Sequence, residues 1–169
     1  MHIVMRCISR WKKELKSLAS KNAVPLEPFT NDDIYYALFL GLISFIPAGL
    51  VLKFSSHDTL KAFALFFSTP IYFLVTGLLM SFFVFVGALF NKTDIEFPKA
   101  ISITLRVMSI HPFLSFILFI PYGSVLNLLL YGFLVSSTTH KMLNVPLRNA
   151  MLFFGALYLA LAFLQLRGI

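Results

Sequence analysis

The sequence predicts an all-α polytopic membrane protein, in which a bundle of five transmembrane helices is preceded by an N-terminal amphipathic interfacial helix. Three observations predict this fold class: a composition of 59% apolar and 12% charged residues, five apolar blocks separated by short polar loops, and an uneven distribution of lysine and arginine. A soluble domain of this length leaves roughly a third of its unfolded surface exposed after folding. The apolar surface of this chain, which includes twenty phenylalanines, therefore needs lipid to cover it.

The first segment, 3–21, has the pattern of a helix that lies on a membrane surface. Apolar residues recur at three- and four-residue steps on one helical face, and basic residues occupy much of the remainder. Such a helix binds anionic lipid headgroups, at about 1 kcal/mol per basic residue near the surface. The predicted membrane-surface residues are Arg6, Arg10, Trp11, Lys12, Lys13 and Lys16. A helix packed on a partner or on the protein's own loops, or an amphipathic targeting peptide, are the alternatives.

This organisation gives two regions. Residues 1–30 form a basic amphipathic helix and a linker on the cytoplasmic face, with Pro25 and Pro28 in the linker, and residues 31–169 form the five-span transmembrane domain. Helix-capping residues in 30–33 predict where the first span begins.

The five spans are predicted from the length of the apolar blocks, because a hydrocarbon core about 30 Å thick needs about 20 helical residues. They cover 34–54, 62–90, 100–120, 125–139 and 150–166. Pro47 and Pro70 predict kinks in the first two spans. The segment 121–124 predicts a tight turn in which Gly123 accepts a positive φ angle.

The third span carries the candidate functional residues Arg106, His111 and Pro112. Arg106 lies near the start of the block, so its long stem allows the guanidinium to reach the interface. His111 lies about 16 Å into the span. Pro112 cannot donate to the carbonyl of Met108, so the His111 imidazole is a possible donor to that group. A structural hydrogen bond, a ligand, ion or proton site, and an oligomer contact remain open for His111.

Polar and small side chains are predicted to pack the spans together. Asn127 and the cluster 136–139 in the fourth block, and His140 directly after it, are expected to hydrogen bond to neighbouring helices. Small residues at four-residue spacing allow close approach of helices. These pairs are Gly77 with Ser81, Gly132 with Ser136, and Ala156 with Ala160.

The basic residues predict the orientation. With five spans, the N-terminal segment and the second and fourth loops share one side, and the cytoplasmic side is the one enriched in lysine and arginine. Eleven basic residues fall on that side: Arg6, Arg10, Lys12, Lys13, Lys16, Lys21, Lys92, Lys99, Arg106, Lys141 and Arg148. Only three, Lys53, Lys61 and Arg167, fall on the other. The N-terminus is therefore predicted to be cytoplasmic and the C-terminus external. The compact loops favour a bacterial cytoplasmic (inner) membrane.

An arginine-bearing entry to the third span in 103–107 is followed by a proline and an apolar run in 111–114, and the loop 144–146 leads through Arg148 to Ala150. In this pattern, which covers about 90–166, the chain resembles the YIP1 family of small polytopic membrane proteins. The resemblance implies a five-span membrane scaffold, and eukaryotic relatives are linked to vesicle trafficking and small GTPases. Met108 stands where family members often carry a tyrosine. The long N-terminal cytosolic domain of the trafficking members is not expected here, so GTPase binding is not carried over.

We expect a scaffold or adaptor without catalytic activity, not an enzyme. The sequence contains no phosphate-binding loop, dinucleotide fingerprint, HExxH, GxSxG or CxxC motif, and its single cysteine excludes an intrachain disulfide. No cofactor and no metal are expected. The expected partners are anionic membrane lipids and other membrane proteins or a second copy of the chain, and not nucleic acid, because the basic residues form no continuous stripe. A small channel or transporter subunit, or an accessory subunit of a larger membrane complex, remains the alternative.

Overall fold

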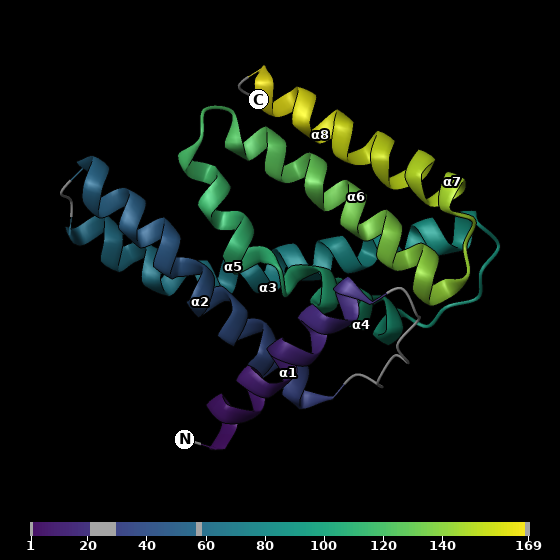
Figure 1. The fold of residues 1–169 in the computed structure, drawn as a ribbon, viewed down its shortest axis with the longest axis horizontal. Helices are drawn as coiled ribbons and strands as arrows, with labels where there is room; N and C mark the ends of the chain where they lie inside the picture. The colour runs from purple at the N-terminus through teal and green to yellow at the C-terminus, as the bar shows by residue number, and fades with distance from the viewer. Residues whose placement is uncertain (1, 21–29, 57–58, 168–169) are drawn as a thin grey trace.

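Helices make up every regular element in the part of the chain that this computed structural model describes, which is residues 2–20, 30–56 and 59–167 (Figure 1). The prediction of an all-α protein is therefore confirmed. The elements are α1 (His2–Ala19), α2 (Asn31–Ser56), α3 (Thr59–Phe90), α4 (Phe97–Met108), α5 (His111–Leu114), the 3-10 helix η1 (Ser115–Phe119), α6 (Gly123–Leu143), α7 (Leu147–Ala150), the π-helical η2 (Met151–Gly155) and α8 (Ala156–Leu166).

The N-terminal helix and the start of the first long helix form where the sequence predicts them. The predicted linker prolines, Pro25 and Pro28, lie outside the described residues. The carboxylate of Asp33 caps the first turn of α2, because it accepts hydrogen bonds from the backbone N–H of Thr30 at 2.5 Å and from its hydroxyl at 3.1 Å. A side-chain acceptor at this position satisfies a donor that the helix leaves open.

Two pairs of long helices pack against each other, α2 with α3 and α6 with α8, and α6 and α8 run antiparallel (Figure 1). Glycines let each pair approach closely. A Cβ atom on Gly41 of α2 would lie 2.7 Å from the Cα of Pro70, and one on Gly132 of α6 would lie 2.9 Å from the Cβ of Tyr158. Both α2 and α3 continue as helices through their internal prolines, Pro47 and Pro70.

The predicted third span is broken rather than continuous. The chain from 97 to 118 forms two helical pieces, Phe97–Met108 and His111–Leu118, which meet at an angle of 42°. Pro112 lies in the first turn of α5, where a backbone N–H has no acceptor within the helix. The missing N–H of the proline therefore costs no helical hydrogen bond. The break therefore precedes the proline, and the helix avoids the unpaired carbonyl that an internal proline would create.

The turn before α6 differs from the prediction in which residue adopts the unusual backbone angle. Tyr122 has a φ of 61°, whereas Gly123 begins α6. Gly123 is needed for space instead, because a Cβ atom there would collide with the carbonyl oxygen of Ile117. The fourth helix extends to Leu143, and Asn144, with a φ of 54°, ends it.

Two helices in the described residues are long and apolar enough to cross a membrane, Phe66–Phe90 and Leu147–Leu166. The bent pair of α4 with the segment His111–Leu118 adds a third if it counts as one span. Each of the five predicted blocks contains helix, but helix length and apolarity do not support a count of five. These helices nevertheless make the chain a membrane protein with a helical bundle.

The core of the bundle lies where α3, α4 and α6 meet α2 and α8. Its largest fully buried side chains are apolar apart from a few hydroxyl-bearing residues, and they include Tyr36, Leu40, Phe73, Val84, Ile103, Val107, Val135 and Phe154. Many large apolar side chains point outward along α3 and α8. Lipid that contacts this outward surface keeps it from water, as expected for a chain with so many apolar residues.

Candidate functional site

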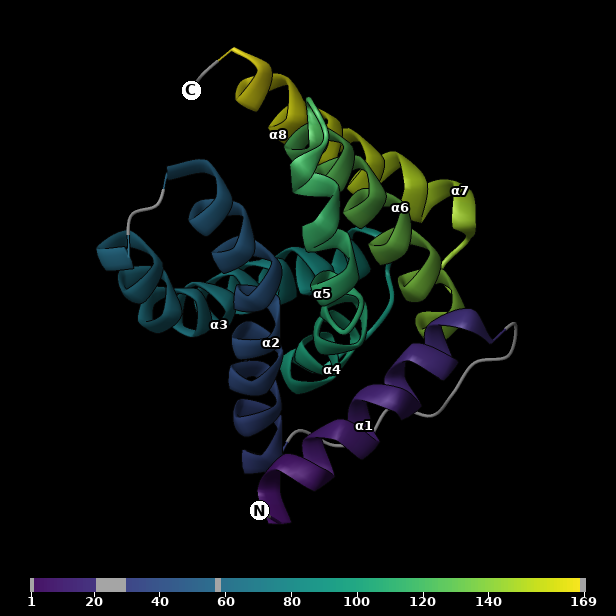
Figure 2. The ribbon, with the colours of Figure 1, turned by 60° about the vertical axis from the view of Figure 1, so that its left-hand side comes forward.

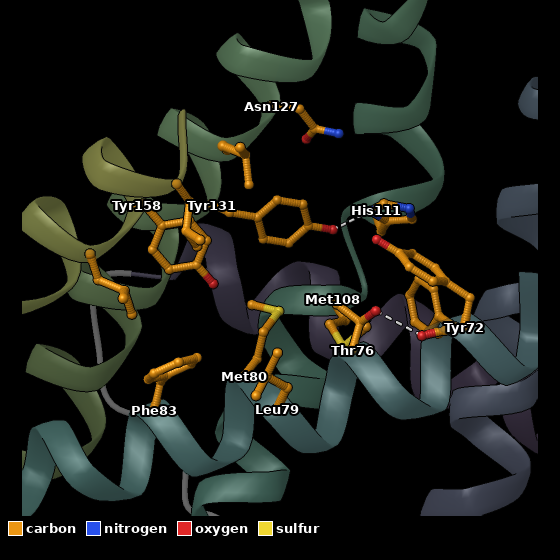
Figure 3. Close-up of a pocket in the computed structure, with 14 residues that line it drawn as sticks. Tyr72, Thr76, Leu79, Met80, Phe83, Met108, His111, Asn127, Tyr131 and Tyr158 are labelled. Carbon is orange, nitrogen blue, oxygen red and sulfur yellow. Dashed lines mark hydrogen bonds between the residues drawn. The ribbon is translucent and has the colours of Figure 1, made fainter. Parts of the chain in front are cut away.

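A pocket of about 280 Å³ lies between α3, α6, α8 and the break that separates α4 from α5 (Figure 3). We call it the His111 pocket. Its lining residues are Tyr72, Phe73, Thr76, Leu79, Met80 and Phe83 from α3, Met108 and His111 from the break, Asn127, Leu128 and Tyr131 from α6, and Leu157, Tyr158 and Leu161 from α8. The break matters for this pocket, because it turns His111 away from the axis of α4 and toward α6.

His111 hydrogen bonds across the pocket to a neighbouring helix. Its Nδ1 meets the hydroxyl of Tyr131 (Figure 3), and Phe73 packs edge-on against the imidazole with ring centroids 5.1 Å apart. Of the roles left open for His111, the structure shows a structural hydrogen bond, and its partner is Tyr131 rather than the carbonyl of Met108. The bond to Tyr131 forms instead, because α4 ends at Met108 and the chain turns before His111.

Asn127 and Tyr131 lie one turn apart on α6, so their side chains share one helical face. The Asn127 carboxamide lies at one end of the pocket, on the same side as the Tyr131 ring (Figure 3). Its Oδ1 is buried and accepts no hydrogen bond from the described residues. The predicted bond from Asn127 to a neighbouring helix is thus not formed at this oxygen.

The pocket is uncharged and opens outward. None of its fourteen lining residues is an aspartate, glutamate, lysine or arginine. Three of them have exposed side chains, Tyr72 at 65%, Leu79 at 55% and Leu161 at 39%, and they come from α3 and α8. Those are the helices that contain the two stretches able to cross a membrane. A neutral lining with neutral hydrogen-bonding groups suits an uncharged molecule better than an ion.

A second site, which we call the ionic cluster, joins α1 to α2 and α4. Nε of Arg106 donates to Oε2 of Glu14 at 2.5 Å, Arg10 pairs with Asp33, and Nε of Arg10 lies 3.9 Å from Oε1 of Glu14. The Arg10 guanidinium also lies 4.6 Å from the centroid of the Tyr36 ring. Two arginines thus meet two carboxylates, and their charges balance.

The guanidinium of Arg106 ends against α1. Its side chain is buried, with 5% of the residue exposed, and it points at Glu14 of α1. Burial of a guanidinium is costly without a counter-charge, and the carboxylate 92 residues earlier in the chain provides one. The residue is therefore part of the contact between α1 and the bundle.

Trp11 is the second anchor of α1. Its Nε1 donates to the carbonyl of Ser109 at 2.6 Å, and its ring stacks on Phe113 with centroids 5.6 Å apart. The carbonyl that accepts this bond lies at the break between α4 and α5. Trp11 and Arg10 therefore contact the protein itself, which corresponds to the alternative of a helix packed on its own chain.

The other predicted surface residues of α1 remain outside. Arg6, Lys12, Lys13 and Lys16 are exposed, and Arg6 forms an exposed ion pair with Asp32 at 3.7 Å. Cys7 faces the bundle and is buried, and this burial raises the pKa of its thiol. One face of α1 is thus bound to the bundle, while a basic face stays accessible.

The three candidate residues of the third block divide between these sites. His111 lines the pocket, Pro112 follows it in the first turn of α5, and Arg106 lies in the ionic cluster. The sequence analysis did not select Glu14 and Tyr131 as site residues. Glu14 carried a signal, because it is the single acid in an otherwise basic helix. Tyr131 carried none, since a tyrosine in an apolar helix has no distinguishing pattern.

The described residues contain no group of three or more histidine, cysteine, aspartate or glutamate side chains that could hold a metal ion. The fold and the sites define a membrane protein whose helical bundle encloses an uncharged pocket. Comparison with protein-family models, with curated proteins and with solved structures found no match.

Proposed function

We propose that this chain is an integral membrane scaffold or adaptor of the YIP1-like type, with five spans and without catalytic activity. The observation that carries the proposal is the way α1 is held. Glu14 and Trp11 fasten one face of α1 to the bundle, and Lys12 and Lys16 stay exposed on the other. A rigidly held basic helix offers a fixed surface to anionic lipid headgroups and to partner proteins.

Contacts of α1 with two distant parts of the chain support the five-span path. Arg10 pairs with Asp33 at the start of α2, and Nζ of Lys141 near the end of α6 donates to the backbone carbonyl of Ser20, directly after α1, at 2.9 Å. Figure 2 shows the ribbon of α1 running from the start of α2 to the end of α6. In a five-span protein, the start of the first span and the end of the fourth lie on the same side. Together with the excess of basic residues, this favours a cytoplasmic N-terminus and an external C-terminus, in a bacterial inner membrane.

Site-specific photo-crosslinking in native membranes tests the scaffold function. A photoreactive residue replaces Lys12 or Lys16, both exposed on α1. The matched control places the same residue at Leu159, which is 61% exposed on the apolar surface of α8. We expect discrete protein adducts, together with lipid adducts, from the two positions on α1, and lipid adducts alone from Leu159.

Only lipid adducts from positions 12 and 16 would contradict a scaffold and would leave α1 as a membrane-surface anchor. Equal protein adducts at all three positions would show that contact with partner proteins is not specific to α1.

A further inference from the structure

The His111 pocket ends at a buried polar group without a partner inside the described protein. Asn127 is 8% exposed, and its Oδ1 accepts no hydrogen bond there. A buried acceptor that has lost water and gained no donor destabilises the folded state. A hydrogen-bond donor supplied by a bound molecule would remove this penalty.

We propose that the His111 pocket binds the hydroxyl headgroup of an uncharged membrane lipid. The lipid hydroxyl donates a hydrogen bond to Oδ1 of Asn127. The hydroxyl of Tyr131, one turn further along α6, bonds to His111 and borders the same space (Figure 3). A hydroxyl is the smallest group that both donates and accepts, so it fits between a carboxamide and a phenol.

The charge of the lining selects the class of lipid. Phosphate headgroups need cationic or multiple N–H donors, and the fourteen lining residues contain no lysine or arginine. An ionised headgroup here would be desolvated without a counter-charge, which is costly. A neutral headgroup loses far less when water is removed.

The size and the mouth of the pocket fit a lipid rather than a free small molecule. About 280 Å³ is near the lower limit for binding sites of small molecules, enough for a headgroup and the first carbons of its chains. The exposed lining residues Tyr72, Leu79 and Leu161 lie on the helices that contain the two stretches long and apolar enough to cross a membrane. The acyl chains would leave the pocket between α3 and α8 and continue in the bilayer.

The experiment uses the full chain purified in a mild non-ionic detergent. Binding of 1,2-dioctanoylglycerol, which is uncharged and has one free hydroxyl, is measured by native mass spectrometry and by the shift in thermal unfolding. Two matched probes are its 3-acetyl ester, in which the hydroxyl is blocked, and dioctanoyl phosphatidic acid, in which it carries phosphate. We expect dioctanoylglycerol to bind at least about tenfold more tightly than either, because one buried hydrogen bond is gained or lost.

The matched variants remove buried oxygens inside and outside the pocket. Asn127→Leu should weaken dioctanoylglycerol binding about tenfold and, without lipid, raise the unfolding temperature, because the unpaired acceptor is gone. Thr139→Val is the control. Oγ1 of Thr139, also on α6, is buried and has no hydrogen-bond partner among the described residues, but Thr139 does not line the pocket. This variant should leave binding unchanged.

Equal binding of dioctanoylglycerol and its acetyl ester to the unmodified chain would overturn the proposal, whether or not the variants fold. Preferred binding of phosphatidic acid would also overturn it. The proposal would also be overturned if Asn127→Leu folds and binds dioctanoylglycerol as tightly as the unmodified chain does.

Discussion

At the scale of single residues, the charges that the chain buries hold α1 in place. Arg106 is buried in α4, and the carboxylate of Glu14, from α1, reaches it at 2.5 Å. A buried pair adds little net stability compared with apolar residues, but removal of one partner costs about 3–5 kcal/mol, because a charge remains without its counter-charge. The pair therefore acts mainly to fix where α1 sits.

Glu14→Gln should release α1 from the bundle, and the single cysteine of the chain reports this. Cys7 is buried on α1, and its raised pKa leaves little thiolate at neutral pH, so maleimide should react slowly with the unmodified protein. A loss of about 3 kcal/mol in docking free energy increases the open population, and hence the rate of labelling, about a hundredfold.

The matched control for this prediction is Arg6→Gln, on the same helix. It removes the ion pair with Asp32, whose side chains are 63% and 64% exposed, and such surface pairs contribute about 0–1 kcal/mol. A labelling rate that stays slow in Glu14→Gln would show that Glu14 is not needed for docking. A labelling rate that rises equally in both variants would show that the loss of any charge on α1 weakens its docking, and that the buried pair has no special role.

At the scale of the helices, small residues decide which pairs pack closely. Ser136 donates to the carbonyl of Gly132 at 2.7 Å and lies 3.3 Å from that of Ala150, and Gly132 rests against Tyr158. The predicted small-residue pair at Gly132 and Ser136 is thus inside the bundle. The pair at Ala156 and Ala160 is exposed instead.

Gly132→Ala should force α6 and α8 apart. The added Cβ would lie 2.9 Å from the Cβ of Tyr158, which is part of a helix and cannot move aside, so we expect a loss of about 1–3 kcal/mol in the free energy of unfolding. Unfolding in sodium dodecyl sulfate mixtures measures this value.

Gly155→Ala is the control, because a Cβ at that position meets nothing within 4 Å. It should be neutral or stabilise the protein by up to about 1 kcal/mol, since alanine favours a helix over glycine. A Gly132→Ala variant as stable as the unmodified protein would show that the approach of the two helices is not limited by this contact.

At the scale of the whole molecule, the sharpest expectation is the topology. With five spans, the loop that contains Asp94 is cytoplasmic and the turn that contains Tyr122 is external. Both side chains are exposed. In a Cys7→Ser background, Asp94→Cys and Tyr122→Cys should be labelled by a membrane-impermeant maleimide from opposite sides of sealed vesicles. Labelling of both from one side would contradict the five-span path.

The candidate site could be predicted only in part, and particular residues show why. His111 and Arg106 stand out in the sequence, because polar groups in an apolar block need partners. The identity of those partners could not be derived. Tyr131 lies 20 residues after His111 and Glu14 lies 92 residues before Arg106. Many groups in the chain could satisfy the same need, and only packing selects among them.

The helical class, the membrane environment, the basic N-terminal helix and most helix boundaries could be predicted from the sequence alone. These follow from apolar length, charge placement and helix caps, which act over a few residues. The tertiary structure decided the break before His111, the docking of α1 through Glu14 and Trp11, and the pocket beside Asn127. The docking of α1 and the pocket depend on contacts between segments far apart in the chain, whereas the break lies next to Pro112 and exposes the Ser109 carbonyl to Trp11. Such contacts form only when the helices pack, and no local pattern of residues specifies them.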